Sequence, residues 1–68
     1  MEVDYDLILC VYNSLVRNIL PSVNIRKVKI MCEGIVNGEV ECDDIVHSMA
    51  IYILKHPMMK MWWGGLVD

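Results

Sequence analysis

Apolar residues recur at helical spacing in three stretches of the chain. In the first, over residues 4–20, they fall four positions apart, at Leu7, Val11, Leu15 and Ile19. Neighbouring apolar positions at Ile8, Tyr12 and Leu20 widen this stripe. The pattern is typical of an amphipathic helix with a broad apolar face. We expect the helix to end before Pro21, because proline disfavours the helical conformation of the residue that precedes it.

Two further stretches repeat the pattern over residues 24–36 and 43–55. The apolar positions of the second stretch are Val28, Met31, Cys32, Ile35 and Val36, and those of the third are Val46, Met49, Ala50, Ile53 and Leu54. Ser22 or Asn24 can cap the second helix, and Asp43 or Asp44 the third. The sequence therefore predicts an all-α fold, in which three helices form one small domain over residues 1–68.

A β-hairpin is the alternative for the middle of the chain. Residues 28–36 also alternate between apolar and polar types, and Asn37-Gly38 is a strong hairpin signal. The returning strand, over residues 39–42, would be short, and a lone hairpin is marginally stable without a third strand. We therefore interpret Asn37-Gly38 as the end of the second helix, with Gly38 in the left-handed conformation.

The C-terminal segment PMMKMWWGGLVD has no polar face of its own. Proline is favoured at the first position of a helix, so we expect a short helical turn from Pro57. Adjacent tryptophans in a helix point about 100° apart, so one of Trp62 and Trp63 can close the core while the other contacts a partner.

Composition adds an argument for a partner. The 68 residues are 56% hydrophobic, against roughly 45–50% in typical globular domains. A chain this short buries only about 60% of the surface that its unfolded form exposes. We expect the surplus apolar surface to pack on another protein or on a second copy. The alternative is a monomer whose six methionines fill the core.

The cysteines and histidines do not form a pattern typical of a metal site or a catalytic site. Cys32 and Cys42 are ten positions apart, whereas structural zinc ligands come in close pairs, and with His47 they would need a fourth ligand from Cys10 or His56. Acidic neighbours disfavour a thiolate at Cys42. We expect no cofactor, no metal and no enzymatic activity.

The cellular location of the protein is inferred from its cysteines and from its first six residues. Three cysteines are an odd number, and the acidic start MEVDYD is unlike a cationic secretion signal. We therefore expect free thiols in the reducing cytoplasm. The longest apolar stretch, ten residues at 45–54, is too short for the roughly 20 residues of a membrane span.

The charge of the chain helps to distinguish a protein-binding module from a nucleic-acid-binding protein. The net charge of −3 disfavours general binding to nucleic acid. A helix-turn-helix DNA-binding regulator is the alternative, because two helices flank a short connection and basic residues gather at Arg17, Arg26, Lys27 and Lys29. However, the third helix would present Asp43 and Asp44 to phosphate.

Taken together, these patterns predict a non-catalytic protein-interaction module. It would act as a small accessory subunit, or as an inhibitor or regulator of a larger protein. Its acidic patch could cover a basic nucleic-acid-binding surface, and the module could also self-associate. Tryptophan and methionine are enriched at interface cores. The predicted partner-binding residues are Met58, Met61, Trp62, Trp63, Glu39, Glu41, Asp43 and Asp44. No motif is specific enough to indicate a family.

Overall fold

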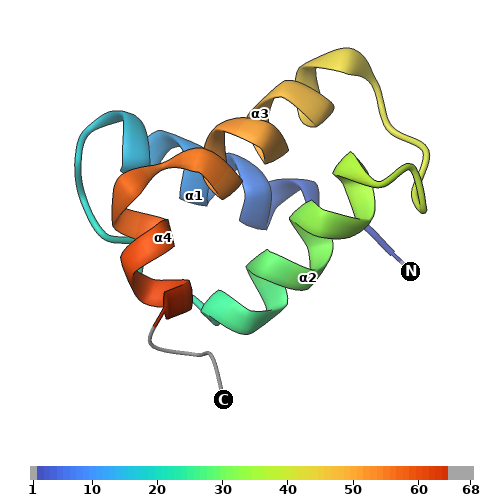
Figure 1. The fold of residues 1–68 in the computed structure, drawn as a ribbon. Helices are drawn as coiled ribbons and strands as arrows, with labels where there is room; N and C mark the ends of the chain where they lie inside the picture. Colours follow the sequence, from blue (N-terminus) through green and yellow to red (C-terminus); the bar gives the residue numbers. More distant parts are fainter. Residues whose placement is uncertain (1, 65–68) are drawn as a thin grey trace.

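Helices account for most of the chain in the computed structural model, which describes residues 2–64 (Figure 1). They are α1 (Tyr5–Val16), α2 (Ile25–Val36), α3 (Asp44–Lys55) and α4 (Pro57–Gly64). The predicted all-α fold is confirmed. The hairpin alternative is wrong, because residues 28–36 belong to α2 and residues 39–42 form a bend and an extended connection.

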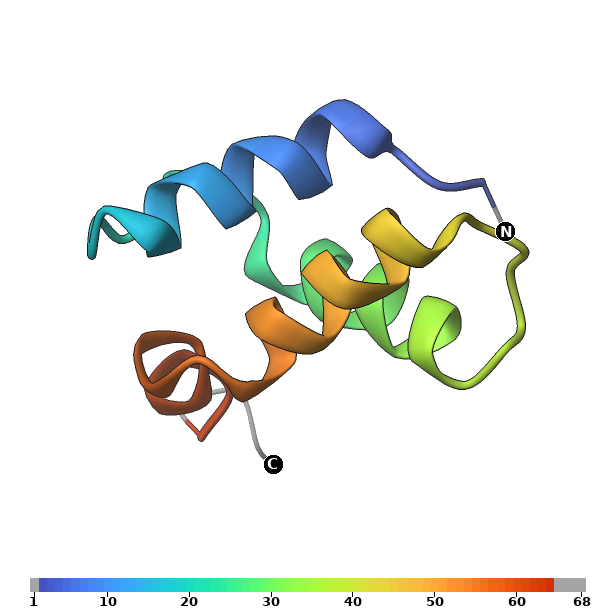
Figure 2. The same ribbon diagram turned by 90° about the horizontal axis from the view of Figure 1, so that it is seen from above.

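Helix α3 lies at the centre of the arrangement and packs against α1, α2 and α4. Figure 2 looks onto α1 and α3, which run in the same general direction, with α2 beneath them. The short α4 packs on both α3 and α2, at the opposite end of the molecule from the α2–α3 connection (Figure 1). The four helices together enclose one core.

Each of the first three helices begins at a side-chain cap. The side-chain oxygens of Asp4, Asn24 and Asp43 accept hydrogen bonds from the backbone N–H groups of residues 7, 27 and 46, at 3.1, 3.2 and 2.9 Å. These bonds satisfy N–H groups that have no partner inside the helix. Asn24 rather than Ser22 caps α2. Asp43 caps α3, and Asp44 occupies its first turn, where a carboxylate interacts favourably with the helix dipole.

The end of α1 differs from the prediction. The helix ends at Val16, four residues before the predicted limit at residue 20, and Asn18 takes a left-handed conformation with φ of 56°. The N–H of Ile19 then donates to the carbonyl of Ser14 at 2.8 Å, which completes a Schellman motif. Asparagine tolerates this conformation, so the helix stops before Pro21 can act. Ile19 and Leu20 are left exposed.

Gly38 ends α2 by the same motif, as predicted. Its φ is +79°, and the N–H of Glu39 donates to the carbonyl of Gly34 at 2.9 Å. The left-handed conformation is unfavourable for residues that carry a Cβ atom, so glycine suits this position.

The predicted C-terminal turn is an eight-residue helix. His56 has an extended backbone between α3 and α4, and Pro57 occupies the first position of α4. The ring nitrogen Nδ1 of His56 accepts a hydrogen bond from the N–H of Met58 at 3.1 Å. His56 thus serves as the side-chain acceptor at the start of α4.

Only apolar side chains fill the core of the described residues. They are Ile8, Val11 and Leu15 of α1, Ile25, Val28, Met31, Cys32 and Ile35 of α2, Val46, Ala50 and Ile53 of α3, and Met59 and Trp63 of α4. Helix periodicity identified most of the contributions of the first three helices. In α1, however, the buried residues are Ile8, Val11 and Leu15. Leu7 lies at the margin of this buried face and is only partly buried.

We expect Gly38→Ala to lower the free energy of unfolding by about 1 kcal/mol, because alanine is strained at positive φ. A Cβ atom at Gly38 would meet no other atom within 4 Å, so the effect comes from the backbone alone. Urea denaturation followed by circular dichroism measures it. Gly64→Ala is the matched control, since Gly64 also has open space around it and lies in a helix. Equal effects of the two substitutions would contradict the assignment.

Candidate functional site

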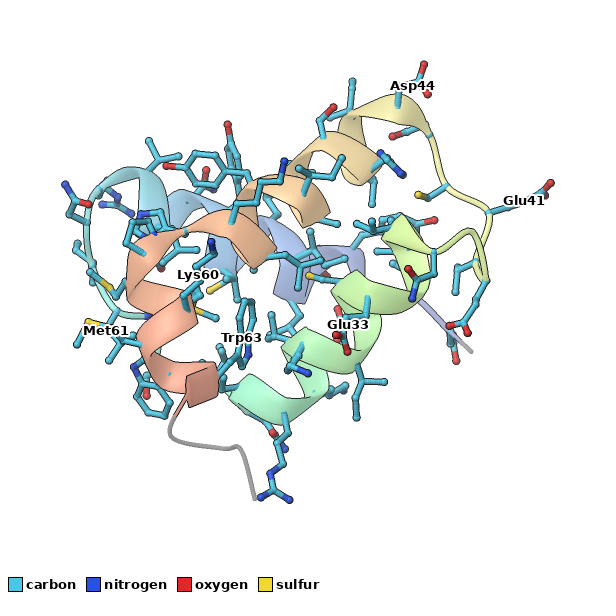
Figure 3. The ribbon with its side chains drawn as sticks, viewed as in Figure 1. Glu33, Glu41, Asp44, Lys60, Met61 and Trp63 are labelled. Atoms are coloured by element: carbon cyan, nitrogen blue, oxygen red, sulfur yellow. The ribbon has the colours of Figure 1, made fainter. Side chains whose placement is uncertain are left out.

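The predicted partner-binding residues form two separate surfaces. Figure 3 shows Met61 on α4 at one end of the molecule, and Glu41 and Asp44 at the other end, around the α2–α3 connection. The molecule measures 29 × 28 × 17 Å along its principal axes. The structure therefore does not bring the aromatic and the acidic parts of the prediction together.

On α4, neighbouring residues divide between the core and the surface. Met59 and Trp63, one helical turn apart, are buried and attach the helix to the core. Met61 and Trp62 are exposed by 80% and 41%, and Met58 is half-buried. Met61 and Trp62 define the α4 surface. This exposed apolar surface lies on a helix whose other side is packed into the core.

Trp63 belongs to the core and not to this surface. Its side chain points from α4 toward α2 and is only 8% exposed (Figure 3). The indole Nε1–H is buried and has no hydrogen-bond partner within residues 2–64. An unpaired buried donor of this kind costs about 1–3 kcal/mol, so Trp63 is held by the apolar packing of its ring.

The acidic segment, residues 39–44, is the second surface. Glu39, Glu41, Asp43 and Asp44 are all exposed there. Asp43 also caps α3. Within residues 2–64 the one ion pair joins Lys29 to Glu33, at 3.3 Å, so these four carboxylates have no cationic partner in that range. Their charges are available to a basic surface.

The three thiols have different environments and lie on different elements. Cys10 is exposed on α1, Cys42 is half-buried in the α2–α3 connection, and Cys32 is buried in α2. Burial and, secondarily, the neighbouring Glu33 carboxylate raise the pKa of the Cys32 thiol from 9.0 to about 12. Cys32 is therefore protonated at neutral pH and unsuited to act as a nucleophile.

The described residues contain no group of three or more His, Cys, Asp and Glu side chains placed to hold a metal ion. In the same range, no helix is both long enough and apolar enough to cross a bilayer.

A further apolar surface, on α1 and α3, was not predicted. Exposed apolar side chains run along both helices at Tyr5, Leu9, Val16, Ile45 and Tyr52. The rings of Tyr12 and Tyr52 meet edge to face between the helices, with their centroids 5.0 Å apart. A shallow hollow of about 520 Å³ lies beside them, lined by Tyr12, Asp44, Ile45, Ser48, Met49 and Tyr52. We call this surface the α1–α3 face.

The signal for this face was present in the sequence. Positions 5, 9, 12 and 16, and positions 45, 49 and 52, have helical spacing and are all apolar. Each helix thus carries a second apolar stripe beside the stripe that enters the core. Periodicity alone merges two adjacent stripes into one broad face, so only the packing shows which stripe is exposed.

Comparison of the chain with protein-family models, with curated proteins and with solved structures finds no match.

The raised pKa of Cys32 predicts a loss of stability in alkali. Between pH 9 and about 12 the unfolded chain releases this proton while the folded chain retains it, so the free energy of unfolding falls as the pH rises. The expected contribution of this single group is about 1.4 kcal/mol per pH unit in that interval. Urea midpoints measured at neutral pH and at steps above pH 9 give the slope.

Cys32→Ala should reduce this slope, although it also lowers the stability at neutral pH by leaving a small cavity. Cys10→Ala is the matched control, because Cys10 is exposed on α1. An unchanged alkaline slope in Cys32→Ala would show that other groups account for the pH dependence.

Proposed function

We propose that this protein is a non-catalytic protein-interaction module, acting as a small accessory subunit or as an inhibitor or regulator of a larger protein. The observation that carries the proposal is the amount of apolar surface outside the core. Among residues 2–64, ten large apolar side chains are at least 38% exposed. Contiguous apolar surface on a soluble domain commonly marks an interaction site.

The α4 surface is the proposed anchor for the partner. Tryptophan leads the residues that dominate binding energy at interfaces, and methionine adapts its shape to irregular partner surfaces. Met61 and Trp62 need little ordering on binding, because Met59 and Trp63 already fix the helix to the core. A pre-ordered contact of this kind binds more tightly for the same buried area.

The acidic segment is proposed to steer the encounter. Its exposed carboxylates attract a basic surface and repel acidic competitors, which raises the association rate more than the final affinity. Because the α4 surface lies at the opposite end of the molecule (Figure 3), a partner that uses both must extend along its length. A basic nucleic-acid-binding groove has the charge that complements the acidic segment, which supports an inhibitory role.

A helix-turn-helix regulator is the weaker alternative. The connection from α2 to α3 runs over residues 37–43, longer than the three to four residues usual in that motif. Asp43 and Asp44 stand at the N-terminus of α3, where a recognition helix meets DNA. Tight retention of duplex DNA at low salt in a filter-binding titration would favour this alternative.

We also propose a cytoplasmic location. The three cysteines are free in the structure, one of them exposed, which agrees with a reducing compartment.

Substitution of Trp62 tests the proposed function. The immobilised chain is incubated with a lysate of its source cells, and the retained proteins are quantified by mass spectrometry. We expect Trp62→Ala to reduce retention of a specific partner about tenfold or more, as loss of an interface hot spot does. Binding of the purified partner is then measured by calorimetry.

Lys60→Ala is the matched control, because Lys60 is an exposed neighbour on the same helix. It should bind the partner as the unmodified chain does. Trp63→Ala should instead lower the free energy of unfolding by about 3–5 kcal/mol, since Trp63 is a core residue. Equal retention by Trp62→Ala and Lys60→Ala would remove the α4 surface from the interface.

A further inference from the structure

The α1–α3 face is distinct from the α4 surface used above and shares only Asp44 with the acidic segment. Helices α1 and α3 run in the same general direction and lie on the side of the molecule seen in Figure 2. Along this face the exposed fractions are 52% for Tyr5, 48% for Leu9, 53% for Val16, 71% for Ile45 and 38% for Tyr52. The apolar stripe therefore continues across two packed helices.

Charged residues flank the two stripes in a regular pattern. On α1, Asp6 stands beside the start of the stripe, and Arg17, the C-cap that follows Val16, stands beside its end. On α3, Asp44 and Lys55 hold the corresponding positions. In both helices the acid precedes the cation by eleven residues. Eleven residues make about three turns, or about 16.5 Å, so acid and cation lie on the same side of the helix.

All four charged side chains are exposed. Within residues 2–64 the single ion pair is Lys29–Glu33, so none of the four is neutralised by another residue of that range. Because both helices run the same way, the face is anionic where α1 and α3 begin and cationic where they end. When a second copy of such a face is reversed end to end, its cationic end lies against the anionic end of the first copy. The apolar face is therefore complementary to a second copy of itself.

We propose that the α1–α3 face is a two-fold interface between two copies of this chain. A two-fold axis that lies in the interface, perpendicular to the helices, places α1 against α1 and α3 against α3 in antiparallel orientation. Asp6 then faces Arg17 of the second copy, and Asp44 faces Lys55 of the second copy. The axis passes near Tyr12 on α1 and Met49 on α3.

The charge pattern favours a second copy over a partner of uniform charge. A wholly basic partner helix would gain attraction at Asp6 and Asp44 but meet Arg17 and Lys55 at the other end, and a wholly acidic one would have the reverse problem. A second copy satisfies both ends at once. Its apolar stripes also meet in the middle, where the rings of Tyr12 and Tyr52 are in contact.

The molecule is large enough to offer the area that a dimer requires. A standard protein interface buries about 800 Å² on each partner, which is about one sixth of the 4580 Å² accessible surface of this molecule. One side of a 29 × 28 × 17 Å body supplies an area of this order. The α4 surface is not part of this face, so the dimer would present two copies of the anchor proposed for the partner.

Sedimentation velocity of the full chain over a range of concentrations tests the proposal. We expect a monomer–dimer equilibrium that reaches twice the 7.9 kDa mass of the chain. Ile45→Ser should raise the dissociation constant about tenfold or more, because each dimer loses two isoleucine side chains from its interface. Ile30→Ser is the matched control: Ile30 is 58% exposed but lies on α2, outside the face, and its substitution should leave the dissociation constant unchanged.

A charge exchange tests the orientation. Asp44→Lys and Lys55→Glu should each weaken the dimer by about two- to tenfold, by placing like charges opposite one another. The double variant should restore the original dissociation constant, because the pattern is then reversed but still complementary. Circular dichroism confirms that each variant is folded.

A monomer at every concentration would overturn the proposal, and so would a dimer that Trp62→Ala or Ile30→Ser disrupts while Ile45→Ser does not. Failure of the charge exchange to restore association would overturn the antiparallel arrangement. These results are separate from the partner-binding test, since a monomeric chain that retains its partner through Trp62 would leave the proposed function intact.

Discussion

The packing of α3 against the other three helices is the interaction on which the rest of the structure depends. Its buried residues, Val46, Ala50 and Ile53, lie at the centre of a core that draws on every helix. Because α3 also carries Ile45 and Tyr52 on its exposed side, the helix that organises the core also contributes to the α1–α3 face.

The small size of the chain explains this combination. A domain of this length has a high ratio of surface to volume, so a sequence that is 56% hydrophobic cannot place all its apolar side chains inside. Of the ten large apolar side chains that are exposed within residues 2–64, seven lie on the α1–α3 face or the α4 surface. Two separate contact surfaces on one small domain suit a protein that joins copies of itself to a larger partner, which is the arrangement we propose.

The core itself contains no ionisable pair and no side-chain hydrogen-bond network among the described residues, and the Nε1–H of Trp63 is left without a partner there. Stability therefore rests on apolar packing, helix caps and two Schellman motifs. The proposal of a binding function therefore rests on the exterior of the molecule, where the exposed apolar side chains and the acidic segment lie.

The sequence by itself determined the features that depend on neighbouring residues. Helical periodicity located three helices within a few residues, the caps of α2 and α3 were among the candidates named, and Gly38 was identified as a left-handed helix end. All of these are set by local backbone chemistry. The early end of α1 was missed because a left-handed Asn18 is a weaker signal than Pro21. Only the tertiary structure decided which tryptophan is buried, that the α4 surface and the acidic segment lie far apart, and that a second apolar stripe on α1 joins one on α3. These depend on the relative positions of the helices, which the spacing of residues along one helix does not specify.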